Sequence, residues 1–301
     1  MISYIKRKDL NIDKYNACVE KSLQSNVYGF SWYLDIVADN WDTLVLDDYN
    51  AVMPIPWRKK YFIKYVYTPF WMLELGIYAK ETIDENEFLI HLFDEFKYVD
   101  LRMNRGNSFG MFHKFQSEKQ MQVISLENGY EKIVNSYNRN RKREISKALK
   151  NDLIEKWSDT PENLIELFKN NVGKRTPQIK DSDYSVLVRL INTCIANKKG
   201  DVLSIYSKDD RLVSSAFFIK HKNKVTEIVC SSDFENRNNG ANAFMNDRAI
   251  FKYQPHFDIF DFGGSSMLKI ADYYHSFGAK TENYVQLKMN KLPFLYKLFK
   301  R

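Results

Sequence analysis

The stretch of the sequence best suited to chemistry is a basic, glycine-containing turn that opens a helix. It reads Arg237-Asn238-Asn239-Gly240-Ala241-Asn242 and follows a strand-like stretch rich in β-branched residues. A helix that begins at such a turn presents unpaired backbone N–H groups at the positive end of its dipole, which favours a bound phosphate. Gly240 would let a ligand approach the backbone, and Arg237 would add a charged donor fork. An ordinary basic turn before an ordinary helix explains the spacing equally well.

The elements around this turn predict an alternating α/β order. A strand is expected before the turn, and residues spaced for one buried face predict a helix after it. A second strand then stops at Gly263-Gly264, and a last helix ends at Gly278, where helices commonly place glycine. The predicted ranges are residues 225–230, 243–253, 257–262 and 267–277.

Three short motifs in this region resemble the GNAT acetyltransferases. Arg237-x-x-Gly240-x-Asn242 resembles their pyrophosphate loop, and the segment from Tyr274 to Ala279 resembles the Tyr-x-x-x-Gly-Phe segment of their last helix. The Asp261-Phe262-Gly263-Gly264-Ser265 turn resembles that of the FemAB-like branch, which carries two GNAT-like domains in tandem and transfers aminoacyl or other acyl groups to amines. The resemblance implies an α/β (α+β) fold of two tandem GNAT-like α/β/α sandwich domains with mixed sheets.

Acyl transfer to an amine needs a polarised carbonyl, a base for the amine proton and an acid for the leaving group. Tyr274 matches the position of the GNAT tyrosine that protonates the leaving group, although a tyrosine in a helix is more often part of a core. Glu227 is a candidate base, but the simpler interpretation, a surface residue of a strand, is favoured. Asp261 ends a strand of the parallel type, where α/β sites commonly form, or it only caps the following turn.

Length and composition predict two soluble domains. A chain of 301 residues exceeds a single core, and a content of 44% hydrophobic and 28% charged residues is that of a globular protein. We place the boundary at residue 125, which gives domains of residues 1–125 and 126–301, the second carrying the donor site. The N-terminus lacks an apolar signal segment, and the three widely spaced cysteines suit a reducing compartment, so a cytoplasmic location is expected.

Positive charge is concentrated in the second half. Residues 1–125 contain 15 Lys and Arg against 17 Asp and Glu, whereas residues 126–301 contain 30 against 21. A single helix predicted over residues 131–150 carries the densest cluster and resembles the Arg-rich helix that opens the second FemAB-like domain. Arg141, Arg143 and Lys147 are therefore candidate contacts for phosphates of a cofactor, of an acceptor or of tRNA. The alternative is an exposed, solvated helix face.

The first half offers weaker candidates. Tyr28, Phe30 and Trp32 lie in an aromatic segment that, by the same resemblance, belongs near the acceptor site, although most such aromatics are core residues. Residues 57–61, Trp-Arg-Lys-Lys-Tyr, combine a basic cluster with aromatics. Strands are expected over residues 41–46 and 51–56, joined as a hairpin, and a helix over residues 85–96.

We consider three functions. The leading one is an N-acyltransferase that uses acetyl-CoA or another acyl-CoA, with an amine of a sugar, amino acid or cell-envelope precursor as acceptor. It leads because the long charge-rich hairpin that some FemAB-like proteins use for tRNA is missing. The alternatives are an aminoacyl-tRNA-dependent aminoacyltransferase and a non-catalytic binding module. No metal, DNA or transmembrane segment is expected, and the apolar, basic C-terminus, residues 292–301, could touch a membrane surface.

Overall fold

The computed structural model describes residues 1–235, 237–264 and 267–293, and it divides the chain into two compact units. Unit 1 contains residues 1–119 and the described residues from Asn283 onward, and unit 2 contains Gln120–Glu282. The division thus lies a few residues before the predicted boundary. The last strand returns to unit 1, whereas the sequence analysis assigned all of residues 126–301 to the second domain.

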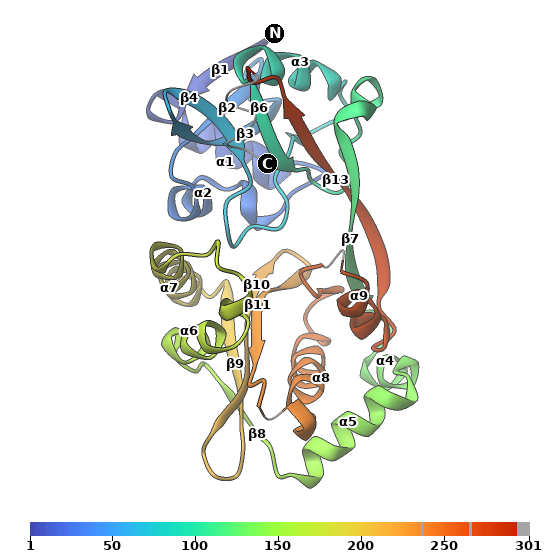
Figure 1. The fold of residues 1–301 in the computed structure, drawn as a ribbon. Helices are drawn as coiled ribbons and strands as arrows, with labels where there is room; N and C mark the ends of the chain where they lie inside the picture. The colour runs from blue at the N-terminus through green and yellow to red at the C-terminus, as the bar shows by residue number, and fades with distance from the viewer. Residues whose placement is uncertain (236, 265–266, 294–301) are drawn as a thin grey trace. The chain divides into compact units, whose positions relative to one another are not determined.

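Unit 1 is built on a mixed sheet (Figure 1). Strands β1, β2 and β3 are antiparallel neighbours, β5 pairs with β3, β3 pairs with β4, β4 with β6 in parallel, and β6 with β13. Helix α1 packs on β3 and β5, and α3 packs on β1 and β2. The strands are β1 Ile2–Lys6, β2 Trp41–Leu46, β3 Ala51–Lys60, β4 Ile63–Tyr67, β5 Tyr78–Ala79, β6 Tyr98–Arg102 and β13 Lys280–Asn290. The helices are α1 Ile12–Lys21, α2 Ser31–Val37 and α3 Asn86–Glu95, with 3-10 turns Arg7–Asp9, Val27–Gly29 and Gly110–Phe115.

Unit 2 is an α/β/α sandwich. Its strands follow the order β7-β12-β11-β10-β9-β8, in which β11 and β12 are parallel and the other pairs antiparallel. Helices α6 and α7 cover one face of the sheet, and α8 covers the other (Figure 1). The strands are β7 Gln116–Ser125, β8 Ile154–Trp157, β9 Gly200–Tyr206, β10 Leu212–His221, β11 Lys224–Ser232 and β12 Ile259–Asp261. The helices are α4 Tyr130–Ser136, α5 Arg139–Lys150, α6 Pro161–Asn170, α7 Asp181–Ala196, α8 Ala241–Tyr253 and α9 Leu268–His275, with 3-10 turns Gly173–Arg175 and Arg237–Asn239.

The helix predicted over residues 131–150 is two helices, so that prediction is wrong. The side-chain oxygen of Asn138 accepts the backbone N–H of Arg141 at 2.9 Å. This bond caps α5 and ends α4 before it, because an N-cap residue has an extended, non-helical backbone. The break gives α5 its own direction, and α5 packs against α8.

The apolar core of unit 2 lies between the sheet and α8. Phe218 of β10, Phe260 of β12 and Met245 of α8 are all fully buried there. The aromatic end of α9 joins this core through Tyr274 and Phe277. Burial of this kind is the main stabilising term of a domain, and it fixes the ends of β11, β12 and α8 relative to one another. Among the described residues, no helix has the length and apolar character needed to cross a bilayer.

Candidate functional site

Strands β11 and β12 pair over only part of their length. Their parallel pairing joins Lys224 to Ile259 and ends where Thr226 meets Asp261. Beyond that point β11 continues to Ser232, while β12 ends and the glycine turn follows. The two strands therefore separate and leave an opening between them. Two parallel strands that separate in this way leave polar backbone groups at the edge of a sheet, where a ligand can reach them.

A β-bulge in β11 determines which side chains face this opening. The register of β10 and β11 shifts between Phe217 and Phe218, which face Val229 and Glu227 respectively, so Ile228 has no counterpart. In a regular strand, residues 227 and 230 would point to opposite faces. The extra residue resets the alternation. As a result Glu227 and Cys230 both lie toward Tyr274 of α9.

Glu227 is buried, which corrects the expectation of a surface residue. Its side chain is only 3% exposed, and Oε2 has no hydrogen-bond partner among the described residues. Burial raises the pKa of this carboxyl from 4.5 to about 7, although the neighbouring Cys230 and Tyr274 side chains lower it in part. A carboxyl with this pKa is half ionised near neutral pH, which suits a general base.

Tyr274 supplies the hydroxyl nearest to Glu227. Its phenol donates to Oε1 of Glu227 across 3.5 Å, and its ring stacks on Phe262 with centroids 4.4 Å apart. Burial first, and then the charge of Glu227, raise the pKa of Tyr274 well above 10. The phenol is therefore protonated at neutral pH and available as a proton donor. Its role as the acid stays a prediction.

Asp261 caps the glycine turn. Its Oδ1 accepts the backbone N–H of Gly263 at 2.9 Å, and the side chain is fully buried. This is the second of the two roles expected from the sequence. A direct catalytic role for Asp261 stays a prediction. Ser265, the last residue of the quoted motif, lies outside the described residues.

The turn before α8 has the expected helix-opening geometry, and the structure gives Gly240 a packing role that the sequence did not predict. Gly240 is the N-cap of α8 with φ +83°, and a Cβ atom there would lie 2.2 Å from the backbone oxygen of Glu144 in α5. The glycine thus allows α5 and α8 to pack closely. Its role in letting a ligand approach the backbone stays a prediction. Asn239 Oδ1 accepts the Ala241 N–H, whereas the N–H groups of Asn242 and Ala243 have no acceptor among the described residues.

Arg141 of α5 brings a buried cation to the same place. Only 5% of the residue is exposed, and its Nε donates to Ser276 Oγ at 2.9 Å. Its guanidinium lies 4.1 Å from the ring centre of Tyr273 and 4.6 Å from that of Phe277. Among the described residues, no carboxylate forms an ion pair with it. A buried guanidinium that lacks a counter-ion is costly unless an anion completes it.

Arg141, Cys230 and the turn before α8 line one cavity of about 340 Å³ within unit 2, and Glu227 lies next to this cavity, beside Cys230. The cavity lies beside the end of β11 and the start of α8, and the contacting pair Arg141 and Tyr273 forms part of its lining together with Cys230. We call it the α8 cavity. Its lining comprises Arg141, Glu144, Val172, Val213, Cys230, Ser231, Ser232, Asp233, Phe234, Asn239, Gly240, Ala241, Asn242, Ala243 and Tyr273. Four of the six residues predicted for the cofactor are therefore gathered here. Asn238 is exposed at the preceding turn, and the Arg237 side chain is outside the described part of the structure.

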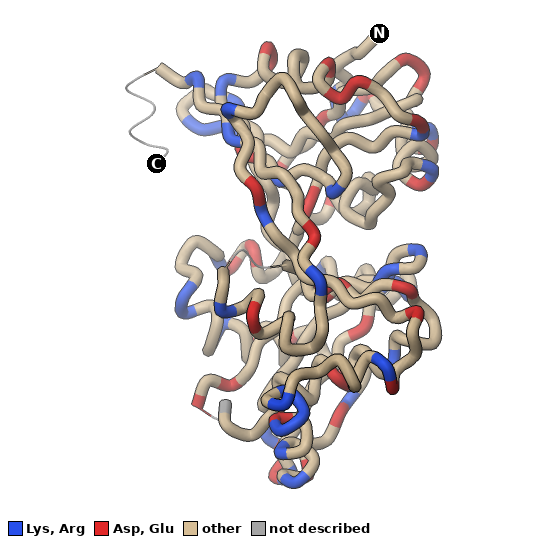
Figure 2. The backbone as a smooth tube through the Cα atoms, turned by 90° about the vertical axis from the view of Figure 1, so that its right-hand side faces the viewer, with Lys and Arg blue, Asp and Glu red and all other residues tan. Residues whose placement is uncertain are grey.

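The three cationic residues predicted on α5 do not all line the same cavity. Arg141 faces the α8 cavity, whereas Arg143 and Lys147 are exposed and line an open groove with other cations of α5. Figure 2 shows Lys and Arg gathered along this helix. The groove is lined by Tyr137, Arg139, Lys142, Arg143, Glu144, Ser146, Lys147 and Lys150.

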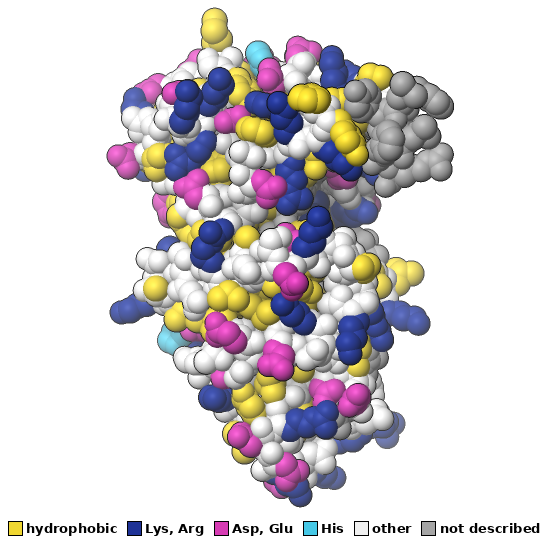
Figure 3. Space-filling view, turned by 60° about the vertical axis from the view of Figure 1, so that its left-hand side comes forward, with side chains coloured by type: hydrophobic (Ala, Val, Ile, Leu, Met, Phe, Trp, Pro, Cys, Tyr) yellow, Lys and Arg dark blue, Asp and Glu magenta, His cyan; other side chains and the backbone are white. Residues whose placement is uncertain are grey.

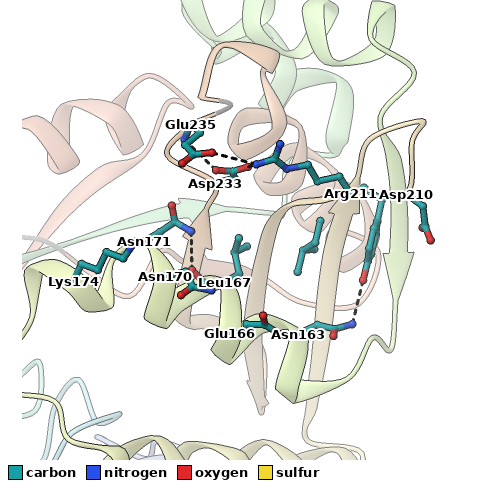
Figure 4. A pocket seen from close by; sticks show the side chains of 12 residues that line it. Asn163, Glu166, Leu167, Asn170, Asn171, Lys174, Asp210, Arg211, Asp233 and Glu235 are labelled. Atoms are coloured by element: carbon teal, nitrogen blue, oxygen red, sulfur yellow. Dashed lines mark hydrogen bonds and ion pairs between the residues drawn. The ribbon is translucent and has the colours of Figure 1, made fainter.

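A second polar cavity, of about 520 Å³, was not predicted from the sequence. Figure 4 shows its side chains, which come from α6, from the turn between β9 and β10 and from the segment after β11. Arg211 forms ion pairs with Asp233 at 2.7 Å and with Glu235 at 3.5 Å. Glu166 and Asp210 add further carboxylates. Asp233 also lines the α8 cavity, so the two cavities adjoin at this residue.

The aromatic candidates of the first half lie in unit 1. Tyr28 is buried, and its ring packs edge-on against Tyr33 with centroids 5.4 Å apart. Trp32 packs against the same ring at 5.4 Å, and both Phe30 and Trp32 are partly exposed. Tyr28 is therefore a core residue, as most aromatics of this segment were expected to be. Their role in binding an acceptor stays a prediction.

Two lining residues escaped the sequence analysis. Tyr273 has a buried hydroxyl with no hydrogen-bond partner among the described residues, and Cys230 reaches Glu227 only because of the bulge. Tyr273 could have been suspected as the neighbour of Tyr274, but no sequence signal marks the bulge. Within the described residues, no group of His, Cys, Asp and Glu is arranged to hold a metal ion.

Comparison with solved structures identifies proteins that share this fold. The structure of FemX aligns over 99% of this chain and 100% of its own, with a TM-score of 0.70 and 11% identity. A tandem GNAT protein from the clavulanic acid biosynthesis pathway aligns over 97% and 99%, with a TM-score of 0.59 and 7% identity. L-PGS from Bacillus licheniformis aligns over 95% and 94%, with a TM-score of 0.56 and 9% identity. No family model and no curated protein matches the sequence. The chain therefore has the tandem GNAT-like fold of the FemAB-like type, as the sequence motifs predicted.

Proposed function

We propose that the protein is an N-acyltransferase that moves an acyl group from acyl-CoA to an amine, with the α8 cavity as the donor site. The observation that carries the proposal is the buried guanidinium of Arg141, which lies beside the N–H groups at the start of α8; neither has an anionic partner within the described part of the chain. Together they form a site for the phosphates of a donor. The fold, shared with a tandem GNAT protein, supports the same function.

In this proposal the acyl group lies at the inner end of the cavity, against Cys230 and Tyr273. The amine nitrogen attacks the thioester carbonyl carbon, and Glu227 takes the proton that the amine loses. The carbon–sulfur bond then breaks, and the thiolate takes a proton from Tyr274. Cys230 is a poor nucleophile for this reaction, because burial raises the pKa of its thiol well above 9.

The acceptor amine would approach through the second cavity. Its carboxylates outnumber its cations, since Glu166, Asp210, Asp233 and Glu235 face only Lys174 and Arg211. This balance favours a cationic amine of a sugar, an amino acid or a cell-envelope precursor. The cavity adjoins the donor cavity at Asp233, which would let donor and acceptor meet near the end of β11.

Turnover with acetyl-CoA and a panel of amines tests the reaction. Thiol release and the mass of the acylated product would be followed for the unchanged protein, Glu227→Gln and Glu131→Gln. Glu131 is exposed on α4 and serves as the matched control. Loss of a general base lowers kcat roughly 100-fold or more, so only Glu227→Gln should be impaired. Binding of acetyl-CoA without turnover on any amine would favour the non-catalytic module instead.

Aminoacyl-tRNA is the alternative donor, and one observation favours it. The exposed cations of α5 line an open groove of about 710 Å³, which is far larger than one nucleotide phosphate needs. RNA bound there would dissociate steeply with salt. A gel-shift titration of aminoacyl-tRNA at two salt concentrations, with Arg143→Met and Lys147→Met, tests this. Tight, salt-dependent binding that both variants weaken would support the tRNA donor, and salt-insensitive or absent binding would exclude it.

A further inference from the structure

The hairpin formed by β3 and β4 carries an unusual combination of side chains at its tip. Phe62 is 92% exposed and Tyr61 is 58% exposed, and these two residues form the whole connection between the strands. Both adopt the left-handed backbone conformation, with φ values of +65° and +48°. Two-residue hairpin loops ordinarily place Asn and Gly in this conformation, because bulky residues are strained in it. The tip thus exposes two large aromatic rings at an energetic cost.

The strands beside these rings carry uncompensated positive charge. Residues 57–67 contain four cations and no carboxylate. Arg58 pairs with Asp39 at 2.6 Å, but Lys59, Lys60 and Lys64 have no ion-pair partner among the described residues. Lys59 and Lys64 even lie directly opposite each other in the strand register, where like charges repel. An anionic surface would relieve this repulsion.

The positions of Lys59 and Lys60 fit a surface better than a groove, whereas the ammonium of Lys64 lies 4.2 Å from the ring centre of Trp57. The ammonium of Lys59 lies 5.7 Å from the ring centre of Phe62, and that of Lys60 lies 5.3 Å from the ring centre of Tyr61. Cations that flank an exposed aromatic tip can contact lipid phosphates while the rings enter the interface between headgroups and acyl chains. Figure 3 shows apolar side chains lying among Lys and Arg side chains on one face of unit 1.

We propose that the β3–β4 hairpin docks the protein on an anionic lipid bilayer, with Phe62 inserted into the interface and Lys59 and Lys60 bound to lipid phosphates. Single-stranded RNA is the competing anionic partner, because bases stack on exposed aromatic rings. The bilayer is favoured because the rings stand at the apex of a two-residue turn, beyond the cations, rather than on the floor of a basic groove. The proposal does not depend on the acyl-transfer reaction.

Vesicle flotation tests the docking surface directly. The full-length protein would be mixed with vesicles of phosphatidylcholine alone, or with about a third phosphatidylglycerol. We expect binding to the anionic vesicles only. Phe62→Ala should weaken it about tenfold, since it removes most of one inserted aromatic side chain. Lys59→Glu should weaken it at least fivefold, since each basic residue near such a surface contributes about that factor.

Two control variants separate this hairpin from other exposed residues of the same kind. Met111 is 69% exposed in unit 1, and Lys142 is an exposed cation of α5. Met111→Ala and Lys142→Glu should each leave vesicle binding within twofold of the unchanged protein. Equal loss with Lys142→Glu and none with Phe62→Ala would overturn the proposal. So would hairpin variants that lose single-stranded RNA binding and keep vesicle binding.

Insertion of the ring has its own readout. A Phe62→Trp variant should show a blue-shifted emission component on anionic vesicles and quenching by lipids brominated on their acyl chains. The measurement is made as a difference from the unchanged protein, which contains five tryptophans. Binding without any quenching of the added tryptophan would contradict insertion. The substitution is expected to leave the fold intact, because Phe62 is almost fully exposed.

Discussion

Replacement of Glu227 by Gln should stabilise the protein in a pH-dependent manner. The pKa of the folded-state carboxyl is raised to about 7 from 4.5, so between these values the unfolded chain releases a proton that the folded chain retains. Stability therefore falls as pH rises through this window and stays lower above it. The difference between the two pKa values corresponds to a loss of about 3 kcal/mol in the free energy of unfolding above pH 7. Gln keeps the shape of the side chain and has no charge to bury, so the variant avoids this loss.

The effect is measured by urea unfolding at several pH values from 4.5 to above 7. The proteins compared are the unchanged protein, Glu227→Gln and Glu131→Gln. Near the lower end, Glu227→Gln and the unchanged protein should have nearly equal free energies of unfolding. Their difference should grow to about 3 kcal/mol at the upper end, because only the unchanged protein must ionise a buried group. Glu131→Gln, at an exposed site, should show no such trend. A constant difference for Glu227→Gln at every pH would refute the reasoning.

Three further outcomes are expected. Gly240→Ala should destabilise the fold by about 2–4 kcal/mol, because its Cβ would meet the backbone of α5. Gly106→Ala, with a similar φ of +87° and open space, should cost only about 1 kcal/mol, and urea unfolding compares the two variants. Arg141→Met should be neutral or stabilising without ligand, since it removes a buried unpaired charge, and a clear loss of stability would show that the charge is compensated. Tyr274→Phe should lower kcat about 100-fold and leave the KM for the donor unchanged, and equal kcat values would exclude Tyr274 as the acid.

Local sequence patterns predicted the elements of unit 2 that surround the turn before α8. Strand β11, helix α8 and the glycine turn after Asp261 were all expected, because alternation, apolar periodicity and glycine placement each act over a few residues. The break at Asn138 was missed, because an Asn inside a charged helix pattern gives little warning that it will act as a cap. The return of β13 to unit 1 was missed for another reason, since pairing between distant strands leaves no local signal.

The candidate site was only partly predictable. The turn before α8 was located, but the packing of Gly240 against α5 was not predicted, because its neighbour Glu144 is almost a hundred positions away in the chain. The burial of Glu227 depends on a bulge and on the packing of α9, so strand propensity alone suggested a surface residue. Arg141 was chosen for its charge, yet only the structure separates it from Arg143 on the same helix.

Calorimetric titration with acetyl-CoA and CoA tests the central claim most directly. The account predicts micromolar binding by the unchanged protein and about 30–100-fold weaker binding by Arg141→Met, since a buried contact between a guanidinium and a phosphate contributes about 2–3 kcal/mol. Arg143→Met, two residues further along the same helix and exposed, should bind within about twofold of the unchanged protein. Equal affinity of Arg141→Met and the unchanged protein, or no binding of either ligand, would contradict the assignment of the α8 cavity as the acyl-CoA site.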